Sequence, residues 1–372
     1  MNHNQRNLSR EKRLIIPKTY GIKYAGSKLK IIPYIVSLIH GLKDVKTVLD
    51  GFSGTTRVSQ ALAQLGYSTT ASDISVWSDV VAHCFLKSSK KDAFYQEIID
   101  HLNDLKGYDG WYTEHYGSDL IESKKPFQAK NTRRLDAIRD EIENLNLEWA
   151  DKSVLLTSLI FALDKVDSTL GHYVAYLSKW SPRSNKDLFL QLPKRFATKQ
   201  SNHHVIRGDI FKTVSANTYD FVYFDPPYGS NNDKMPPSRV RYASYYHIWT
   251  SIIKHDKPEI FGKANRREDT RDGISASIFE EFRKNKAGSF IAMEALDELI
   301  QKTNSKYILL SYSSGGRTTK KELNSIINKK GKMIKAIEIN YKKNVMSNMR
   351  WTNDWINSDG KYLEYLFLMQ KK

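Results

Sequence analysis

The segment Asp225-Pro226-Pro227-Tyr228 carries the strongest chemical signal in the sequence, and it directly follows an apolar run at residues 221–224 that predicts a buried strand. The two prolines lack backbone N–H groups, so the turn offers only hydrogen-bond acceptors. Asp225 adds a carboxylate and Tyr228 adds a flat aromatic face. Acceptors beside a stacking ring suit a planar base that carries an amino group. The other interpretation is an ordinary proline-rich strand exit.

A glycine-containing turn is the second signal. Residues 50–56 (Asp-Gly-Phe-Ser-Gly-Thr-Thr) lie between a predicted strand at 47–50 and a predicted helix at 57–65. Glycine in such a turn lets the backbone approach a nucleotide-like ligand closely. Asp73 ends the next predicted strand, where a carboxylate can accept hydrogen bonds from both hydroxyls of a ribose. No Gly-Lys-Ser/Thr ending follows the turn, which disfavours a phosphate-binding loop.

Three other polar segments are weaker signals when each is taken alone. Residues 23–28 (Lys-Tyr-Ala-Gly-Ser-Lys) suit a helix start, with Lys28 able to meet a carboxylate. Asp209 lies at a predicted strand end, and residues 311–316 (Ser-Tyr-Ser-Ser-Gly-Gly) follow another predicted strand. Each of these segments is equally compatible with ordinary capping or turn chemistry.

The elements that position these segments alternate between strand and helix in two zones, residues 14–84 and 203–372. This alternation predicts an α/β fold with one sheet. Residues 85–202 lose the alternation and are predicted to form a mainly helical insertion. The strands are predicted at residues 47–50, 68–73, 205–206, 221–224, 307–312, 333–341 and 362–369, and the helices at 29–39, 57–65, 93–105, 131–150, 153–166, 278–302 with a break near Gly288, and 320–329.

Composition restricts the class of protein. The 372 residues include 58 Lys plus Arg against 41 Asp plus Glu, a net charge of +17 that favours a polyanionic partner. No apolar run approaches the ~18 residues of a membrane span, and no secretory signal is expected at the N-terminus. The single cysteine, Cys84, excludes a disulfide framework and a cysteine-rich zinc site. We therefore expect a cytoplasmic protein without a metal.

Four of these segments occur in the order and local context of Dam-like adenine-N(6) DNA methyltransferases of the alpha group, a family that the chain resembles. The matching segments are residues 23–28, 50–54, 208–209 (Gly-Asp) and 225–228. The resemblance covers roughly residues 20–84 and 203–315. It implies a Rossmann-like methyltransferase sheet, S-adenosyl-L-methionine as cofactor, and a target-recognition domain at residues 85–202.

The resemblance also implies roles for individual cofactor-side residues. These are Tyr24 and Lys28 near the methionine end of the cofactor, Asp50, Phe52, Gly54 and Thr55 in the cofactor turn, Asp73 at the ribose, and Asp209 with Ile210 at the adenine. One position departs from the family pattern, because Thr56 stands where the family has the second glycine of its Phe-x-Gly-x-Gly turn. Threonine is sterically more demanding there, although its hydroxyl could donate to the methionine carboxylate.

The target base is expected against Asp225, Pro226 and Tyr228. The implied reaction is methyl transfer to the exocyclic amine of an adenine flipped out of double-stranded DNA, within a restriction-modification system that could include a separate cognate endonuclease. Base readout is expected in the insertion and nearby loops. The predicted DNA contacts, which could equally be solvated charges, are Lys179, Arg183, Lys194, Arg195, Arg239 and Arg241.

Three alternatives remain open from the sequence. An RNA adenine methyltransferase can carry the same catalytic turn, and a charge of +17 suits either nucleic acid. A cytosine-amine methyltransferase is disfavoured, because that chemistry usually has serine at the position of Asp225. A non-catalytic nucleic-acid-binding protein with a relic cofactor fold is the third, and the retained polar residues of both turns argue against it.

Overall fold

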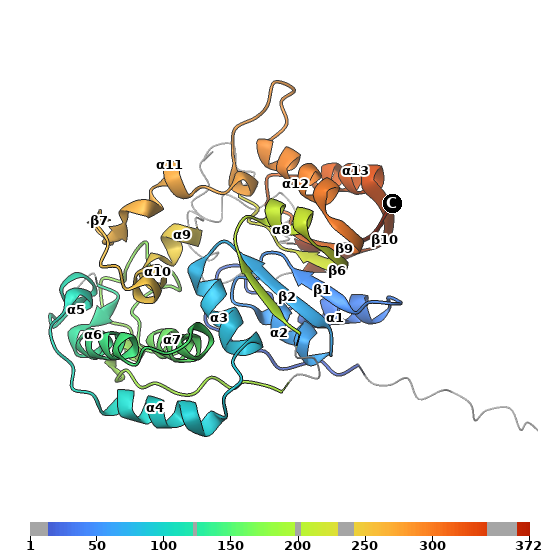
Figure 1. The fold of residues 1–372 in the computed structure, drawn as a ribbon. Coiled ribbons are helices and arrows are strands. Elements are labelled where there is room, and N and C mark those ends of the chain that lie inside the picture. Colours follow the sequence, from blue (N-terminus) through green and yellow to red (C-terminus); the bar gives the residue numbers. More distant parts are fainter. Residues whose placement is uncertain (1–13, 122–124, 198–201, 230–241, 341–362) are drawn as a thin grey trace, which may run out of the picture.

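The computed structural model describes residues 14–121, 125–197, 202–229, 242–340 and 363–372. Seven strands form one sheet in the order β10-β11-β9-β6-β1-β2-β5 (Figure 1). All neighbours are parallel except β11, which is antiparallel to both of its neighbours. The α/β prediction is therefore confirmed. The strands are β1 (Thr47–Asp50), β2 (Ser68–Asp73), β5 (His204–Arg207), β6 (Thr218–Phe224), β9 (Asn304–Ser313), β10 (Gly331–Asn340) and β11 (Leu363–Lys371).

The order of the parallel strands reverses between β1 and β6. From β1 the chain proceeds through β2 to β5 at one edge, whereas from β6 it proceeds to β9 on the other side. In open sheets of this kind, ligands bind beyond the carboxyl ends of the strands at the reversal point. Asp50 ends β1 and Asp225 directly follows β6, so the two strongest sequence signals emerge side by side at this point.

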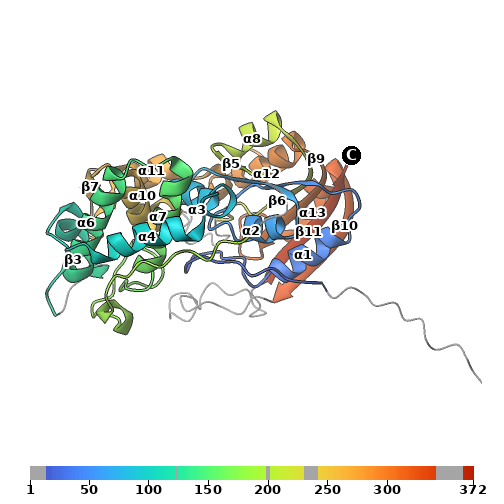
Figure 2. The ribbon, with the colours of Figure 1, turned by 60° about the horizontal axis from the view of Figure 1, so that its bottom comes forward.

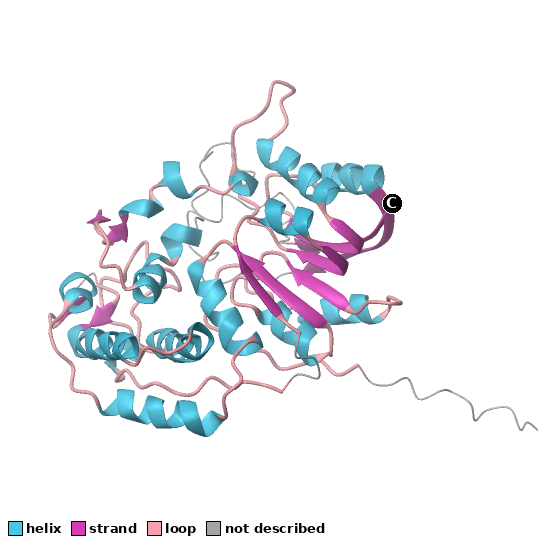
Figure 3. Cartoon of the chain, in the orientation of Figure 1, coloured by secondary structure: helices cyan, strands magenta, loops and turns pink. Residues whose placement is uncertain are grey.

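Helices cover both faces of the sheet (Figure 3). Val48 and Leu49 point to opposite faces, since side chains alternate along a strand. Val48 lies in a core cluster with residues of α1 and α2, and Leu49 lies in another with residues of α8, α12 and α13. The helices are α1 (Ile32–His40), α2 (Arg57–Gln64), α3 (Val76–Leu86), α8 (Ile210–Ala216), α12 (Ile291–Lys302) and α13 (Lys320–Lys330).

A helical body lies beside the sheet, with α3 between the two (Figure 2). Its core cluster joins Leu135, Leu155 and Trp249 from three separate helices. Residues that follow the Asp225–Tyr228 turn in sequence therefore pack with the insertion rather than with the sheet. The body contains α4 (Asp92–Asp104), α5 (Trp111–Tyr116), α6 (Ala129–Asn144), α7 (Trp149–Leu163), α9 (Tyr242–Tyr245) and α10 (His247–Lys254).

The remaining described elements are short. They are the ribbons of β3 (Gly117–Ser118) with β4 (Phe127–Gln128) and of β7 (Ile260–Phe261) with β8 (Arg266–Arg267), the helix α11 (Asp272–Ser275), and the 3₁₀ helices η1 (Pro182–Asn185), η2 (Glu268–Thr270) and η3 (Ile278–Glu280). The predicted helix at residues 131–150 is wrong in its bounds, because α6 ends at Asn144 and Asn146 has a φ of +45°. Among the described helices, none combines the length and apolar character that crossing a bilayer requires.

Candidate active site

The glycine turn after β1 packs directly on β6. The Gly51 N–H donates to the Tyr223 carbonyl at 2.9 Å. A Cβ atom at Gly51 would lie 2.7 Å from Phe224 Cδ1, closer than real Cβ contacts, and 3.0 Å from Ile210 Cδ1, which is tight. Glycine is therefore required for the close approach of this turn to the end of β6, which brings the two strand ends into one site.

Asp50 presents a buried carboxylate at the base of the turn. Its Oδ2 accepts hydrogen bonds from the Ser59 N–H at 2.9 Å and the Ser59 hydroxyl at 2.6 Å. Its Oδ1 is buried and has no hydrogen-bond partner among the described residues. Burial raises the pKa of Asp50 to about 7, although the bonds from Ser59 oppose this. The site thus holds one spare buried acceptor.

Asp73 braces the same turn from the end of β2. Its Oδ2 accepts the Gly54 N–H at 2.8 Å, and its Oδ1 accepts the N–H and hydroxyl of Ser75 at 2.8 and 2.6 Å. Burial raises the pKa of Asp73 above its ordinary value, and these hydrogen bonds work in the opposite direction. Each carboxylate oxygen has two lone pairs, so Oδ2, which accepts one of these bonds, can accept a further donor.

Thr56 adopts the left-handed conformation, with φ +59° and ψ +17°, immediately before α2. A β-branched residue is a genuine outlier in this region, and glycine adopts it without strain. This backbone geometry explains why the Phe-x-Gly-x-Gly turn, as the sequence comparison above gave it, has glycine at the position of Thr56. The Thr56 side chain is fully buried, and its hydroxyl accepts a hydrogen bond from Gln60 Nε2 at 3.2 Å.

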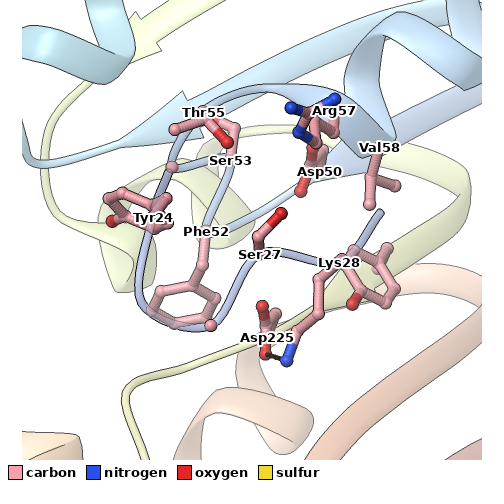
Figure 4. A pocket seen from close by; sticks show the side chains of 13 residues that line it. Tyr24, Ser27, Lys28, Asp50, Phe52, Ser53, Thr55, Arg57, Val58 and Asp225 are labelled. Atoms are coloured by element: carbon pink, nitrogen blue, oxygen red, sulfur yellow. Dashed lines mark ion pairs between the residues drawn. The ribbon is translucent and has the colours of Figure 1, made fainter. Parts of the chain in front are cut away.

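The Lys28 ammonium is the centre of a buried charge cluster beside the Asp225–Tyr228 turn. Its Nζ lies 2.8 Å from Asp225 Oδ1 (Figure 4). It also lies 2.8 Å from Glu364 Oε1 and 2.5 Å from the Tyr228 hydroxyl. These three contacts use all three N–H donors of the ammonium. The side chains of Lys28 and Glu364 are each only 8% exposed. Lys28 thus meets two carboxylates, as the sequence allowed, and its expected contact with the cofactor stays a prediction.

The surroundings of Asp225 favour its protonated form at mildly acidic pH. Burial, the largest cause, raises its pKa to about 6; the Lys28 ammonium lowers the pKa and the Glu364 carboxylate raises it. Burial lowers the pKa of Lys28, but the carboxylates of Asp225 and Glu364 more than compensate and hold it well above its ordinary value. Lys28 therefore stays charged.

One pocket joins the two turns at the strand reversal (Figure 4). The predicted residues that line it are Tyr24, Lys28, Asp50, Phe52, Gly54, Thr55 and Asp225. Sequence reasoning gave no site role to the six other lining residues, namely Gly26, Ser27, Ser53, Arg57, Val58 and Tyr223. Arg57 Nη1 donates to the Thr19 carbonyl at 2.8 Å, while its buried Nε has no hydrogen-bond partner among the described residues.

Five predicted cofactor or catalytic residues lie outside the lining of this pocket: Asp73, described above, and Asp209, Ile210, Pro226 and Tyr228. Asp209 is exposed and caps α8 by accepting the Phe211 N–H at 2.7 Å. Ile210 is buried beneath Gly51. Pro226 is buried, and the Tyr228 ring packs edge-on against Tyr312 with ring centres 5.1 Å apart.

An aromatic stack connects the residues before α1 to the helical body. The Tyr24 ring stacks on Tyr246 with centroids 4.7 Å apart, and Tyr246 stacks on Trp249 with centroids 4.3 Å apart. The Tyr246 hydroxyl also accepts the Ala25 N–H at 2.7 Å. Tyr24 lines the pocket and Trp249 belongs to the core of the helical body. The stacked rings therefore join the pocket to the helical body.

The predicted DNA contacts differ in how their charges are used. Lys179 and Lys194 are exposed. The Arg183 guanidinium donates to the carbonyls of Asp167 and Thr169, both at 2.7 Å. The Arg195 guanidinium contacts Ser88, the Lys90 carbonyl and Asp92. Both arginines therefore brace the fold, and Arg239 and Arg241 lie outside the described residues.

Residues 24–326 match the family of D12 class N6 adenine-specific DNA methyltransferases. The chain belongs to this family. The resemblance inferred from the four sequence segments is thereby confirmed. In the described residues, no group of three or more His, Cys, Asp or Glu side chains is arranged to hold a metal ion.

Similar proteins carry names from bacterial DNA modification. The modification methylase StsI of Streptococcus sanguinis is 28% identical and matches 94% of this chain and 52% of its own length. The type II methyltransferase M.NlaIII of Neisseria lactamica is 26% identical, over 93% of this chain and 99% of its own length. The type II methyltransferase M.FokI of Planomicrobium okeanokoites is 25% identical, over 94% and 53%. The chain thus spans about half of StsI and M.FokI.

Solved structures are less similar. A Thermoplasma acidophilum protein is 7% identical with a TM-score of 0.33, over 92% of this chain and 88% of its own. A candidate S-adenosylmethionine-dependent methyltransferase from Streptococcus mutans is 12% identical with a TM-score of 0.35, over 93% of this chain and 50% of its own. These scores are too low to support an inference, so the fold assignment rests on the strand order of this chain.

Proposed function

We propose that this chain transfers a methyl group from S-adenosyl-L-methionine to the N6 amine of adenine in double-stranded DNA, at a specific sequence. The observation that carries this proposal is the pocket at the strand reversal, where the carboxylate of Asp225 lies beside the glycine turn that contains Asp50. Family membership supports the same reaction.

The residues of the pocket fit the zwitterionic methionine end of the cofactor. An ammonium group needs an acceptor, and Asp50 Oδ1 is a buried acceptor with no partner among the described residues. A carboxylate needs a donor, and Arg57 Nε is a buried donor in the same situation. Asp73 would accept hydrogen bonds from the ribose hydroxyls, and Asp209 with Ile210 would hold the adenine. When bound, the cofactor supplies an electrophilic methyl group on a sulfonium: the S–C bond to this methyl would break as the N–C bond forms, the neutral thioether would leave, and the methylated amine would lose one proton to water.

Asp225 would act on the target amine by accepting its hydrogen bond. The adenine amine is a poor nucleophile because its lone pair is delocalised into the ring, and positive charge grows on the nitrogen as it attacks. The contacts of Lys28 and Tyr228 both use Asp225 Oδ1, so Oδ2 is the oxygen we assign to the substrate N–H. The Pro226 carbonyl would accept the second N–H. A fixed negative charge where positive charge develops lowers the barrier.

The target base has to leave the duplex to reach this site, as is general for enzymes that act on a base amine. Tyr228 would stack on the extruded adenine and replace part of the lost stacking. The exposed Lys179 and Lys194, together with the surplus of 17 positive charges, would neutralise phosphates and make binding strongly salt-dependent.

A place in a type II restriction-modification system is the biological role we infer. M.NlaIII and M.FokI are both named type II methyltransferases, and M.NlaIII matches this chain over nearly its whole length. A separate cognate endonuclease that recognises the same DNA sequence would be the functional partner.

The decisive experiment is methyl transfer with isotopically labelled cofactor to DNA of known sequence, followed by mapping of modified bases at single-base resolution. We expect N6-methyladenine at one recurrent sequence, and none with Asp225→Ala, which should keep its fold by circular dichroism. Labelled RNA without labelled DNA would support an RNA enzyme instead. Near-normal turnover by Asp225→Ala would remove this carboxylate from the reaction.

A further inference from the structure

Glu364 is a second carboxylate at the catalytic turn, contributed by the antiparallel strand at the end of the chain. It is the second residue of β11 and pairs with Ser313 across the neighbouring strand β9. The residue is only 6% exposed. No local motif surrounds it, and the proposed chemistry has so far not used it.

The contacts of Glu364 all converge on the catalytic cluster. Its Oε1 lies 2.8 Å from Lys28 Nζ, accepts the Ser311 hydroxyl at 2.5 Å and lies 3.4 Å from the Tyr228 hydroxyl. Lys28 Nζ in turn lies 2.8 Å from Asp225 Oδ1. One ammonium is thus shared between two carboxylates, and Tyr228 contacts all three charged groups.

The charge of this cluster is unusual for a buried group. With both carboxylates ionised, one positive and two negative charges leave a net charge of −1. A simple buried ion pair would be neutral, and an uncompensated buried charge is costly unless a ligand supplies the opposite charge. The nitrogen of a substrate amine supplies such a charge as it is methylated. The excess negative charge therefore stabilises the transition state, in which the substrate nitrogen is positive, more than it stabilises the protein without substrate.

We propose that Glu364 is a positioning residue for methyl transfer: it holds the Lys28 ammonium between two carboxylates, so that Asp225 is oriented by Lys28 without being neutralised. This inference rests on the proposed function. If Glu364 lost its charge, Lys28 would pair with Asp225 alone and would cancel the negative charge that the substrate nitrogen needs.

Titration separates this role from mere structural support. The groups that face Asp225 are Lys28 before α1, Asp50 at the end of β1, Tyr223 on β6, Tyr228 in the turn, Tyr242 on α9 and Glu364 on β11. The three tyrosines stay neutral, since burial raises the pKa of each. Glu364 is one of the charges that raise the pKa of Asp225, so its removal should let Asp225 ionise at lower pH.

The test compares Glu364→Gln, which removes the charge, with Glu364→Asp, which keeps it. Glu338→Gln on the adjacent strand β10 is the matched control, because this half-exposed carboxylate pairs with Lys320 away from the pocket. We expect Glu364→Gln to lower kcat at pH 8 by about tenfold or more, to leave the KM for the cofactor within about twofold, and to move the acidic limb of the kcat profile to lower pH. Glu364→Asp should recover part of kcat, and Glu338→Gln should match the unmodified protein.

A second measurement is independent of activity. The Asp225 carboxyl can be titrated by NMR in protein with 13C-labelled aspartate, its resonance being assigned from Asp225→Asn. We expect a lower pKa for Asp225 in Glu364→Gln. Absence of adenine methylation by the unmodified protein would contradict the proposed function. The NMR titration would still test separately whether Glu364 sets the pKa of Asp225. An unmoved Asp225 titration overturns the inference, even if kcat falls. If Glu364→Gln fails to fold, Glu364→Asp decides, because it keeps the charge. Loss of activity in Glu364→Asp with an unchanged pKa of Asp225 would overturn the proposed role of Glu364.

Discussion

Replacing Asp225 by asparagine is expected to stabilise the folded chain while it abolishes methyl transfer. Asparagine has the shape of a protonated aspartate and carries no charge. Lys28 would keep its ion pair with Glu364 at 2.8 Å. The variant therefore removes a buried charge without leaving the ammonium alone, and the site gains stability at the expense of its chemistry.

The size of the gain follows from the pKa of Asp225, which burial raises from 3.8 to about 6. At ~1.36 kcal/mol per pH unit, this difference destabilises the ionised folded state by about 3 kcal/mol, an order-of-magnitude figure. Because the folded pKa lies above the unfolded one, the penalty is absent below pH ~4 and complete above pH ~7. Linkage gives a gain for asparagine of about 2 kcal/mol at pH 5 and about 3 kcal/mol at pH 8.

Urea unfolding of both proteins at pH 5 and pH 8, followed by circular dichroism, measures this gain. Asp220→Asn on the same strand is the control, since the N–H groups of Lys46 and Thr47 outweigh burial and hold the pKa of Asp220 below its ordinary value. That substitution should destabilise the chain by a similar amount at both pH values. An Asp225→Asn variant that is less stable than the unmodified protein at pH 8, or a gain that does not grow with pH, would refute the reasoning.

Three further outcomes are expected. Gly51→Ala should lower the free energy of unfolding in urea by about 1–3 kcal/mol, because the new Cβ has no room. Gly208→Ala should change it by less than about 0.5 kcal/mol, since nothing lies within 4 Å of the new Cβ. Equal effects of the two substitutions would contradict the packing account. Arg183→Ala should lower the melting temperature, while Lys179→Ala should leave it unchanged and weaken DNA binding in a salt-dependent way by fluorescence anisotropy. Tyr228→Ala should reduce kcat more than duplex affinity, and equal losses of both would argue against stacking on an extruded base.

The strands next to the glycine turn could be predicted almost to the residue. The predicted bounds of 47–50 and 68–73 coincide with those of β1 and β2. A short apolar or β-branched run flanked by a glycine turn is typical of a parallel strand that is covered on both faces. The turn itself was recognisable because its glycines and aspartate are adjacent in the sequence.

The sequence did not reveal helix α3, because most of its surface is buried. Nine of its residues are buried, since it lies between the sheet and the helical body. A helix that is buried on most of its surface shows no polar face, so the periodicity that reveals an amphipathic helix is absent. The break after α6 was missed because Leu145 and Leu147 continue an apolar pattern through a turn.

The catalytic cluster shows where sequence reasoning ends. Asp225 and Tyr228 are recognisable from a local motif, and Lys28 from another. Glu364 joins them only because β11 inserts antiparallel beside β9, and no local spacing encodes that pairing. The use of all three Lys28 donors is likewise a property of the assembled strands, not of any single segment.

The stack of Tyr24, Tyr246 and Trp249 has a consequence for engineering new target specificity. A chimera that exchanges only residues 85–202 with those of a relative would keep this chain's α10 facing foreign partners, and misfit there would be transmitted through Tyr24 to the pocket. Transplanting the segment that bears Tyr246 and Trp249 together with the insertion would keep the packing between them intact. Functional hybrids should therefore require exchange of both segments.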